Sequence, residues 1–318
     1  MILIFGAFDG FHLGHRRLLE TAAAMAGRST ANNAGGWGVV TFSPHPGNVI
    51  KEREIPVLFT EPERDVLARF LRIPRTVKIP FTPETARMSP AEFLDFIERL
   101  LPVTGIVVGK DFRFGRNREG DTAFLREWSE AKGWLFEEAE PLSIDGEKVG
   151  SSSIRSHVAH GSVALARRLL GYPFFFEGTV VPGDGRGAKL GFPTANVHYP
   201  PEKVMPRRGV YCVSVFVDSM WMPGALNVGV NPTFLQEERG IRAETHIIGY
   251  NGSLYGKKIS VFFEEFLRDE EKFDSAEQLV SRMKEDVLLS GKIFREAAQA
   301  WRELYEQLGT ALSGGDIS

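Results

Sequence analysis

The sequence has one cysteine, no long apolar run and no large excess of charge of either sign. Because Cys212 is alone, the chain can form no intrachain disulfide, and its apolar context GVYCVSVFV is typical of a buried strand residue. No stretch of about 18 apolar residues occurs, so the sequence predicts no membrane-spanning helix and no membrane partner. The 38 basic and 41 acidic residues give a formal net charge of −3, which argues against a nucleic-acid partner.

The remaining composition is typical of a globular protein, with 318 residues of which 43% are hydrophobic and 25% are charged. A chain of this length is expected to form two domains. Neither an internal repeat nor a low-complexity tract is present. Met1 leads directly into an apolar run with no signal peptide before it, so we expect a cytoplasmic protein, either a monomer or a weak homo-oligomer.

The first half alternates short apolar runs with helical patterns. The predicted strands are residues 1–5, 37–42, 76–79 and 105–109. Buried strands that alternate with helices predict an α/β domain, a Rossmann-like parallel sheet with flanking helices. Ligands of such a sheet collect at the carboxyl ends of its strands.

The second half has a different periodicity. Gly171 and Pro173 end the helical region, and short strands separated by turns follow, from Phe174 to Phe263. This pattern predicts an antiparallel β-barrel followed by C-terminal helices. We therefore predict one domain at residues 1–171, a second at 172–309 and a disordered tail at 310–318.

The first predicted strand leads into a motif that carries chemistry, GAFDGFHLGH. Its candidate site residues are Gly6, Phe8, Asp9, His12, Gly14 and His15. A helix start attracts an anion, Gly14 allows a phosphate to approach the backbone, and imidazoles can stabilise charge at phosphorus. Two histidines at this spacing are also compatible with a solvated helix cap or a metal site, although no Cys or Glu follows at zinc-like spacing.

Three later stretches of the first half are further candidates. His45 lies in a Pro-His-Pro loop after the second strand, where it is either a wall of the site or part of a rigid loop. The glycine-flanked loop after the fourth strand contains Asp111, Phe112 and Phe114. Such a loop suits a planar ligand that bears phosphate, or it is a surface loop anchored by one Phe.

Residues 151–155 begin a helix with three serines and an arginine. Ser151, Ser152 and Arg155 could form a second anion site there, although a serine at a helix start is more often a simple cap.

The second half opens with a loop rich in glycine and cations. Its candidate residues are Gly183, Gly185, Arg186, Gly187 and Lys189. The loop is not a P-loop, since it has no Gly-Lys-Ser/Thr and no helix is expected after it, but its backbone N–H groups could surround phosphates. Thr194 and Asn196 follow on one face of a strand, either as Mg²⁺ ligands or as a polar cross-strand pair.

Taken together, these motifs resemble those of bacterial bifunctional riboflavin kinase/FAD synthetases, over nearly the whole chain. FDGFHLGH is also similar to the nucleotidylyltransferase signature, and GKDFRFG matches a family element almost residue by residue. In the second half, GDGRGAKLGFPTAN, LNVGVNPTF and ETHII occur in the family's order. The stretch GSSSIR departs from the family motif, because Gly150 replaces its first Ser and Ser152 replaces its Thr; the missing Ser could weaken a phosphate contact.

The resemblance implies two activities. The barrel would transfer the γ-phosphate of ATP to riboflavin with Mg²⁺, which gives FMN, and the α/β domain would adenylylate FMN to FAD with release of pyrophosphate. The implied catalytic residues are His12, His15, Arg155 and Glu244, with Glu244 as general base. The implied nucleotide-binding residues are Gly6, Phe8, Asp9, Gly14, Ser151, Ser152, Gly183, Gly185, Arg186, Gly187 and Lys189. The implied flavin-binding residues are His45, Asp111, Phe112, Phe114, Tyr255 and Arg268, and the implied Mg²⁺ ligands are Thr194 and Asn196.

Two alternatives remain open at this point. One is a nucleotidylyltransferase that acts on another phosphorylated substrate and carries a barrel without kinase activity. The other is a flavin-binding protein without turnover, against which the intact His12, His15 and Glu244 argue. Without the resemblance, a single Glu in a strand indicates a solvent-facing charge.

Overall fold

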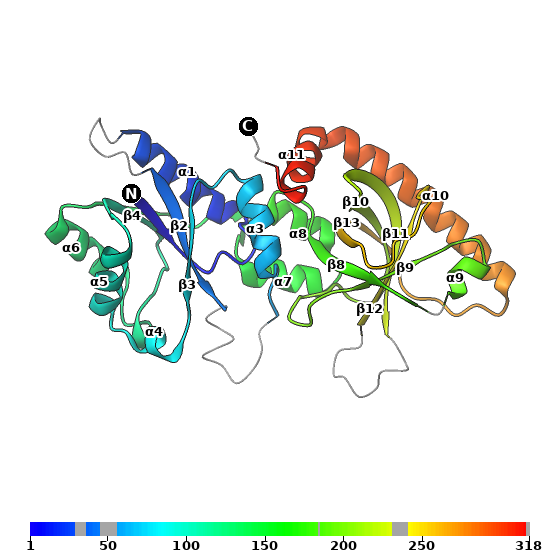
Figure 1. Cartoon of the computed structure of the whole chain (residues 1–318), viewed down its shortest axis with the longest axis horizontal. Helices are drawn as coiled ribbons and strands as arrows, with labels where there is room; N and C mark the ends of the chain where they lie inside the picture. The colour runs from blue at the N-terminus through cyan, green and yellow to red at the C-terminus, as the bar shows by residue number, and fades with distance from the viewer. Residues whose placement is uncertain (29–35, 45–55, 184, 231–240, 316–318) are drawn as a thin grey trace. The chain divides into compact units, whose positions relative to one another are not determined.

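The computed structural model describes residues 1–28, 36–44, 56–183, 185–230 and 241–315 (Figure 1). The chain forms two compact units. The first comprises Met1–Ile55 and Leu67–Gly150, and the second comprises Pro56–Val66 and Ser151–Ser318. Among the helices in the described ranges, none is long and apolar enough to cross a membrane.

The first unit contains a five-stranded parallel sheet, which confirms the predicted Rossmann-like domain. Its strands are β1 (Ile2–Phe5), β2 (Trp37–Ser43), β3 (Thr76–Pro80), β4 (Gly105–Gly109) and β5 (Leu135–Ala139). Their order is β3-β2-β1-β4-β5. The sequence analysis missed β5, because this edge strand reads LFEEA and its Leu135 is 49% exposed, so it lacks the apolar run of a buried strand.

Helices surround this sheet and fix the ends of its strands. They are α1 (Leu13–Arg28), α4 (Pro83–Arg87), α5 (Pro90–Leu100) and α6 (Thr122–Lys132), with the short helix η1 (Arg116–Arg118) and the hairpin β6 (Ser143–Ile144) and β7 (Glu147–Lys148). Helix α3 (Glu61–Phe70) is divided between the two units, with its first six residues in the second. Phe5 of β1 and Val108 of β4 share one core with Phe93 of α5. This core holds the carboxyl ends of β1 and β4, where two of the candidate loops begin.

The second unit is built on a closed six-stranded barrel, as predicted. Its strands are β8 (Phe175–Val181), β9 (Ala195–His198), β10 (Gly209–Val217), β11 (Met220–Val230), β12 (Ile241–Ile247) and β13 (Lys258–Arg268), in the order β10-β11-β12-β9-β8-β13. All six neighbouring pairs are antiparallel. The helices are α7 (Ser151–Ala159), α8 (Val163–Leu170), α9 (Arg186–Lys189), α10 (Ala276–Ala300) and α11 (Arg302–Leu312).

Three details differ from the sequence-based expectations. The compact units divide after Gly150, so α7 and α8 belong with the barrel, whereas the predicted boundary follows residue 171. The glycine-rich loop, expected to lead into no helix, contains the single turn α9. Helix α11 extends to Leu312 because its apolar face buries Leu308 and Ala311, so the first residues of the predicted tail are helical.

The second unit also includes a short segment from the first half of the sequence, Pro56–Val66. Val57 pairs with Lys203 in a parallel bridge, and Nζ of Lys203 lies 2.7 Å from Oε2 of Glu63, with both side chains at most 1% exposed. The other carboxylate oxygen of Glu63 accepts a hydrogen bond from the backbone N–H of Glu177 in β8. The Lys203 ammonium also lies 4.2 Å from the centre of the Phe59 ring, a cation–π contact. A buried ion pair therefore fastens this segment to the barrel.

Breaking this pair should be costly. Lys203→Met leaves the Glu63 carboxylate buried without its cation, so we expect the free energy of unfolding to fall by about 3–5 kcal/mol. Lys257→Met is the matched control, because its partner Asp218 is exposed, and should cost less than about 1 kcal/mol. Urea unfolding of the full chain measures both; equal losses would contradict a dominant role for the buried pair.

Candidate active sites

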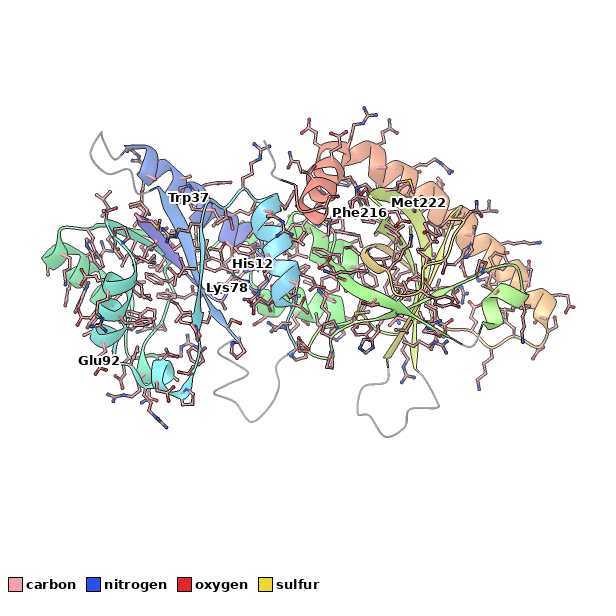
Figure 2. The ribbon with its side chains drawn as sticks, viewed as in Figure 1. His12, Trp37, Lys78, Glu92, Phe216 and Met222 are labelled. Carbon is pink, nitrogen blue, oxygen red and sulfur yellow. The ribbon has the colours of Figure 1, made fainter. Side chains whose placement is uncertain are left out.

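A strained loop delivers the two histidines of the first unit to the start of α1. Phe8 (φ 48°), Gly10 (φ 104°) and Phe11 (φ 35°) adopt left-handed backbone conformations, which cost free energy in the two phenylalanines. The two rings stack at 5.3 Å and are almost fully buried, so their burial offsets that strain. The chain then reaches His12, labelled in Figure 2, directly before α1.

His12 uses one ring nitrogen to cap the helix, which leaves the other ring nitrogen to contact a ligand. Its carbonyl accepts a hydrogen bond from the backbone N–H of Arg16, and its Nδ1 accepts one at 3.3 Å from the backbone N–H of His15. An accepting Nδ1 carries no proton, so the ring proton is on Nε2, which can donate to a ligand. The helix-cap interpretation and the phosphate-site interpretation therefore use different atoms of the same ring.

Both imidazoles are held in the neutral form. The rings of His12 and His15 stack with their centres 3.6 Å apart. Burial lowers the pKa of His12 to about 4, although the nearby Asp9 acts in the opposite direction. Burial, and then the neighbouring His12, lowers the pKa of His15 well below its usual value. Nδ1 of His15 is buried and has no hydrogen-bond partner among the described residues.

Gly14 packs closely against its neighbours at this helix start. A Cβ atom there would lie 3.2 Å from Nδ1 of His12 and 3.5 Å from the carbonyl oxygen of Val149. The chain at Val149 thus runs beside this helix start. At Gly150 a Cβ would meet nothing within 4 Å, so the serine of the family motif would fit there.

The other predicted residues of the first half have different surroundings. Asp111 pairs with Lys148 at 2.6 Å on the surface, and this hydrogen bond lowers the pKa of its carboxyl group. Phe112 is half-buried and stacks on Phe114 at 5.8 Å, whereas Phe114 is 7% exposed and belongs to the core. Phe112 is therefore the ring that a ligand could contact, and Phe114 anchors the loop. His45 lies outside the described residues.

The start of α7 has the features of an anion site. Ser151 and Arg155 are half-buried and Ser152 is exposed, all within the first five residues of the helix. The N-terminal N–H groups of such a helix attract anions, and an arginine in its first turns adds a bidentate donor.

In the barrel, three polar residues form a row across neighbouring strands. Glu244 of β12 lies opposite Asn196 of β9 on one side and Asn227 of β11 on the other. Paired residues of an antiparallel sheet point to the same face, so the three side chains are neighbours. The sequence analysis assigned no role to Asn227, although it lies in the quoted stretch LNVGVNPTF. Its Oδ1 atom is buried and has no hydrogen-bond partner among the described residues.

The predicted Mg²⁺ ligands fit a phosphate-bound cation. A Cβ atom on Gly183 would overlap the side chain of Asn196, and one on Gly187 would overlap the carbonyl oxygen of Phe192 and touch Thr194. The glycine-rich loop therefore packs against the side-chain amide of Asn196, nearest its Nδ2, and lies beside the hydroxyl of Thr194. Gly185 (φ 66°) supplies the left-handed turn of this loop, and Lys189 is exposed beside it. The side chain of Arg186 lies outside the described part.

Arg242 is a site residue that the sequence analysis missed. Its Nε donates to Oδ1 of Asn196 at 2.7 Å and lies 2.6 Å from Oε1 of Glu244. The signal was present in the sequence, since Arg242 and Glu244 are two apart in a strand and so share a face.

The two remaining flavin candidates differ in what they contact. Arg268, at the end of β13, makes a bidentate pair with Asp286 of α10, with its Nη2 2.7 Å from Oδ2, and its side chain is 11% exposed. In this structure Arg268 therefore fastens α10 to the barrel. Tyr255 is 67% exposed and is available to a ligand.

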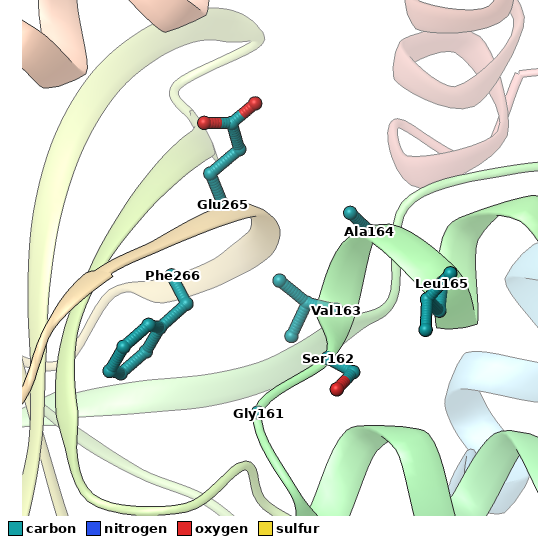
Figure 3. A pocket seen from close by; sticks show the side chains of 7 residues that line it. All are labelled: Gly161, Ser162, Val163, Ala164, Leu165, Glu265 and Phe266. Carbon is teal, nitrogen blue, oxygen red and sulfur yellow. The ribbon is translucent and has the colours of Figure 1, made fainter.

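A shallow hollow of about 340 Å³ lies elsewhere in the second unit, between the turn that precedes α8 and the end of β13 (Figure 3). Val163, Glu265 and Phe266 are among its lining residues. None of the predicted site residues lines this hollow, so it is not part of either candidate site.

The comparisons with known proteins place this architecture in one family. A family model for FAD synthetase matches residues 1–153, and one for riboflavin kinase matches residues 170–294. Bifunctional riboflavin kinase/FMN adenylyltransferases are similar over the whole length: that of Pseudomonas fluorescens is 34% identical and that of Listeria monocytogenes 30% identical, with 89% and 90% of each chain covered.

A crystal structure of a macrolide-efflux protein from Streptococcus pneumoniae has a TM-score of 0.82 and 28% identity, and the likeness covers 91% of this chain and 93% of that one. The class of protein is a bifunctional enzyme, in which an α/β unit with a nucleotidylyltransferase-type histidine motif is joined to a kinase-type barrel. The chain belongs to the family of bifunctional riboflavin kinase/FMN adenylyltransferases, which confirms the predicted family.

The burial of the histidines predicts a pH dependence of stability. The pKa of His12 is about 4 in the folded chain and about 6.5 when unfolded, so between these values the unfolded chain binds a proton that the folded one does not. The stabilisation is complete above pH 6.5 and is lost as the pH falls, by about 2 kcal/mol at pH 5. His15 acts in the same direction.

His12→Asn removes this titration and keeps an acceptor for the helix cap. Between pH 7 and pH 5 the free energy of unfolding should fall by about 2 kcal/mol less in the variant than in the parent, as measured by urea unfolding. Identical losses would show that His12 titrates normally in the folded protein.

Proposed function

We propose that the two units carry out successive steps of FAD formation, with the residue roles given below. The barrel phosphorylates riboflavin to FMN, and the α/β unit adenylylates FMN to FAD. The observation that supports this most directly is that the FAD synthetase match covers the histidine pair and the riboflavin kinase match covers the Glu244 row. We also propose that the reaction takes place in the cytoplasm, where ATP is available and a lone buried cysteine stays reduced.

In the kinase step Glu244 acts as general base. Its carboxylate lies in the row with Asn196 and Asn227 and accepts the proton of the riboflavin 5′-hydroxyl as that oxygen attacks the γ-phosphorus of ATP. Mg²⁺ held by Thr194 and Asn196 neutralises phosphate charge when it is bound. The N–H groups of the glycine-rich loop surround the phosphates.

In the adenylylation step no protein nucleophile is needed. A phosphate oxygen of FMN attacks the α-phosphorus of ATP, and pyrophosphate leaves. His12 donates through Nε2–H, and His15 and Arg155 stabilise the charge that develops at phosphorus. Neutral imidazoles do this as hydrogen-bond donors, much as oxyanion-hole donors do, so catalysis is mainly positioning and electrostatics.

We further propose that residues 1–171 form the adenylyltransferase domain, that 172–309 form the kinase domain, and that a short tail follows. The two family matches, which end at residue 153 and begin at residue 170, support a functional boundary in this region. The Pro56–Val66 segment shows that the kinase barrel also buries residues from outside that range.

The kinase role is tested by Glu244→Gln, which keeps size but cannot accept the proton. Formation of FMN from riboflavin should fall by about 10²–10⁴, the usual loss for a general base, while conversion of supplied FMN to FAD continues. Both rates are measured on one preparation. Unchanged phosphorylation would reduce Glu244 to a surface charge.

The adenylylation role is tested by His12→Asn against His12→Gln. Asparagine keeps the acceptor for the helix cap but has no donor at the Nε2 position, so FAD formation should fall by about 10²–10³. Glutamine places an amide nitrogen near Nε2 and should retain more activity. Phosphorylation of riboflavin should be normal in both variants, and full FAD formation by His12→Asn would rule out a donor role for His12.

A further inference from the structure

Arg242 occupies the centre of the kinase site as the structure presents it. Its guanidinium lies between the amide oxygen of Asn196 and the carboxylate of Glu244, at 2.7 and 2.6 Å. The side chains of Arg242 and Glu244 are only 22% and 29% exposed, so solvent screens these contacts incompletely. No motif of the resemblance includes this arginine.

This position conflicts with a metal ion on the same oxygen. Mg²⁺ binds oxygen ligands at about 2.1 Å, so an ion on Oδ1 of Asn196 would lie within about 5 Å of the Arg242 Nε that donates to that atom. Two cations at this separation repel each other strongly in a half-buried site. The guanidinium and the metal therefore compete for Asn196 in the observed arrangement.

We propose that Arg242 is a stand-in cation: it pairs with Asn196 and Glu244 and withdraws from them when Mg²⁺ binds with the nucleotide. This inference rests on the proposed metal role of Thr194 and Asn196. Binding of the metal must displace the Arg242 contacts, so Arg242 weakens the affinity of the site for the cation. It also keeps Glu244 paired until the metal and nucleotide arrive, which makes it a positioning residue.

The rival explanation is a purely structural clamp, in which Arg242 holds Asn196 ready for the metal. The two explanations predict opposite changes in metal affinity when Arg242 is replaced. Removal of a competitor tightens metal binding, whereas removal of a clamp loosens it.

The test is Mn²⁺ binding to the full chain in the presence of ADP, followed by electron paramagnetic resonance. Thr194→Val identifies the barrel site as the Mn²⁺ component that this variant weakens. Arg242→Met should tighten that component by about tenfold, the size of one charge-assisted contact. Lys292→Met on α10 removes a positive charge from an exposed side chain and should leave the affinity unchanged.

The gain in Mn²⁺ affinity must also be confined to this site. Arg242→Met should therefore leave Mn²⁺ binding unchanged when it is combined with Thr194→Val. Unchanged or weaker Mn²⁺ binding in Arg242→Met would overturn the stand-in role, and so would a gain that persists in that background. If Thr194→Val weakens no component at all, the metal site itself is misplaced. The kinase assay with Glu244→Gln is independent of these outcomes, so the general-base assignment can fail or stand separately.

Discussion

Close approach of a glycine backbone to a functional side chain is the constraint that both candidate sites share. At Gly14 the helix start packs against the ring of His12, and at Gly183 the glycine-rich loop packs against the amide of Asn196. A side chain at Gly183 would overlap the amide of Asn196, and one at Gly14 would press lightly on the ring of His12. Since phosphates are bound largely by backbone N–H groups, the backbone has to come this close.

The two sites nevertheless use different electrostatics. In the α/β unit, burial lowers the pKa of both histidines, whose rings stack on each other at the helix start. In the barrel, Arg242 and Glu244 form a half-buried ion pair, in which the proposed exchange of a metal ion for the guanidinium would take place.

The sequence predicted the fold well where burial is continuous along the chain. The apolar runs of β1, β2 and β4 and the change of periodicity after Pro173 were sufficient for the sheet and the barrel, while the exposed edge strand β5 gave no such signal. Ion pairs between residues far apart in the sequence could not be predicted either. Nothing near Glu63 indicates that it would be neutralised by Lys203, 140 residues later, and nothing near Arg268 indicates its pairing with Asp286.

For the site, sequence motifs supplied the residues but not their states. The spacing of His12 and His15 left a cap, a metal site and a phosphate site open, and only the ring geometry separates the capping atom from the donating one. Arg242 was overlooked because no motif contains it, although its distance of two residues from Glu244 placed both on one face. Phe114 was predicted as a flavin contact, and the structure places its ring in the core.

The most direct test of a chain that performs both reactions is the origin of the two phosphates in its product. Riboflavin is incubated with the parent protein, Mg²⁺ and ATP labelled with different isotopes at the α and γ phosphates. The account predicts FMN that carries only the γ label and FAD that carries one γ and one α label in equal amounts. FAD that lacks the γ label, or FMN that carries the α label, would contradict it.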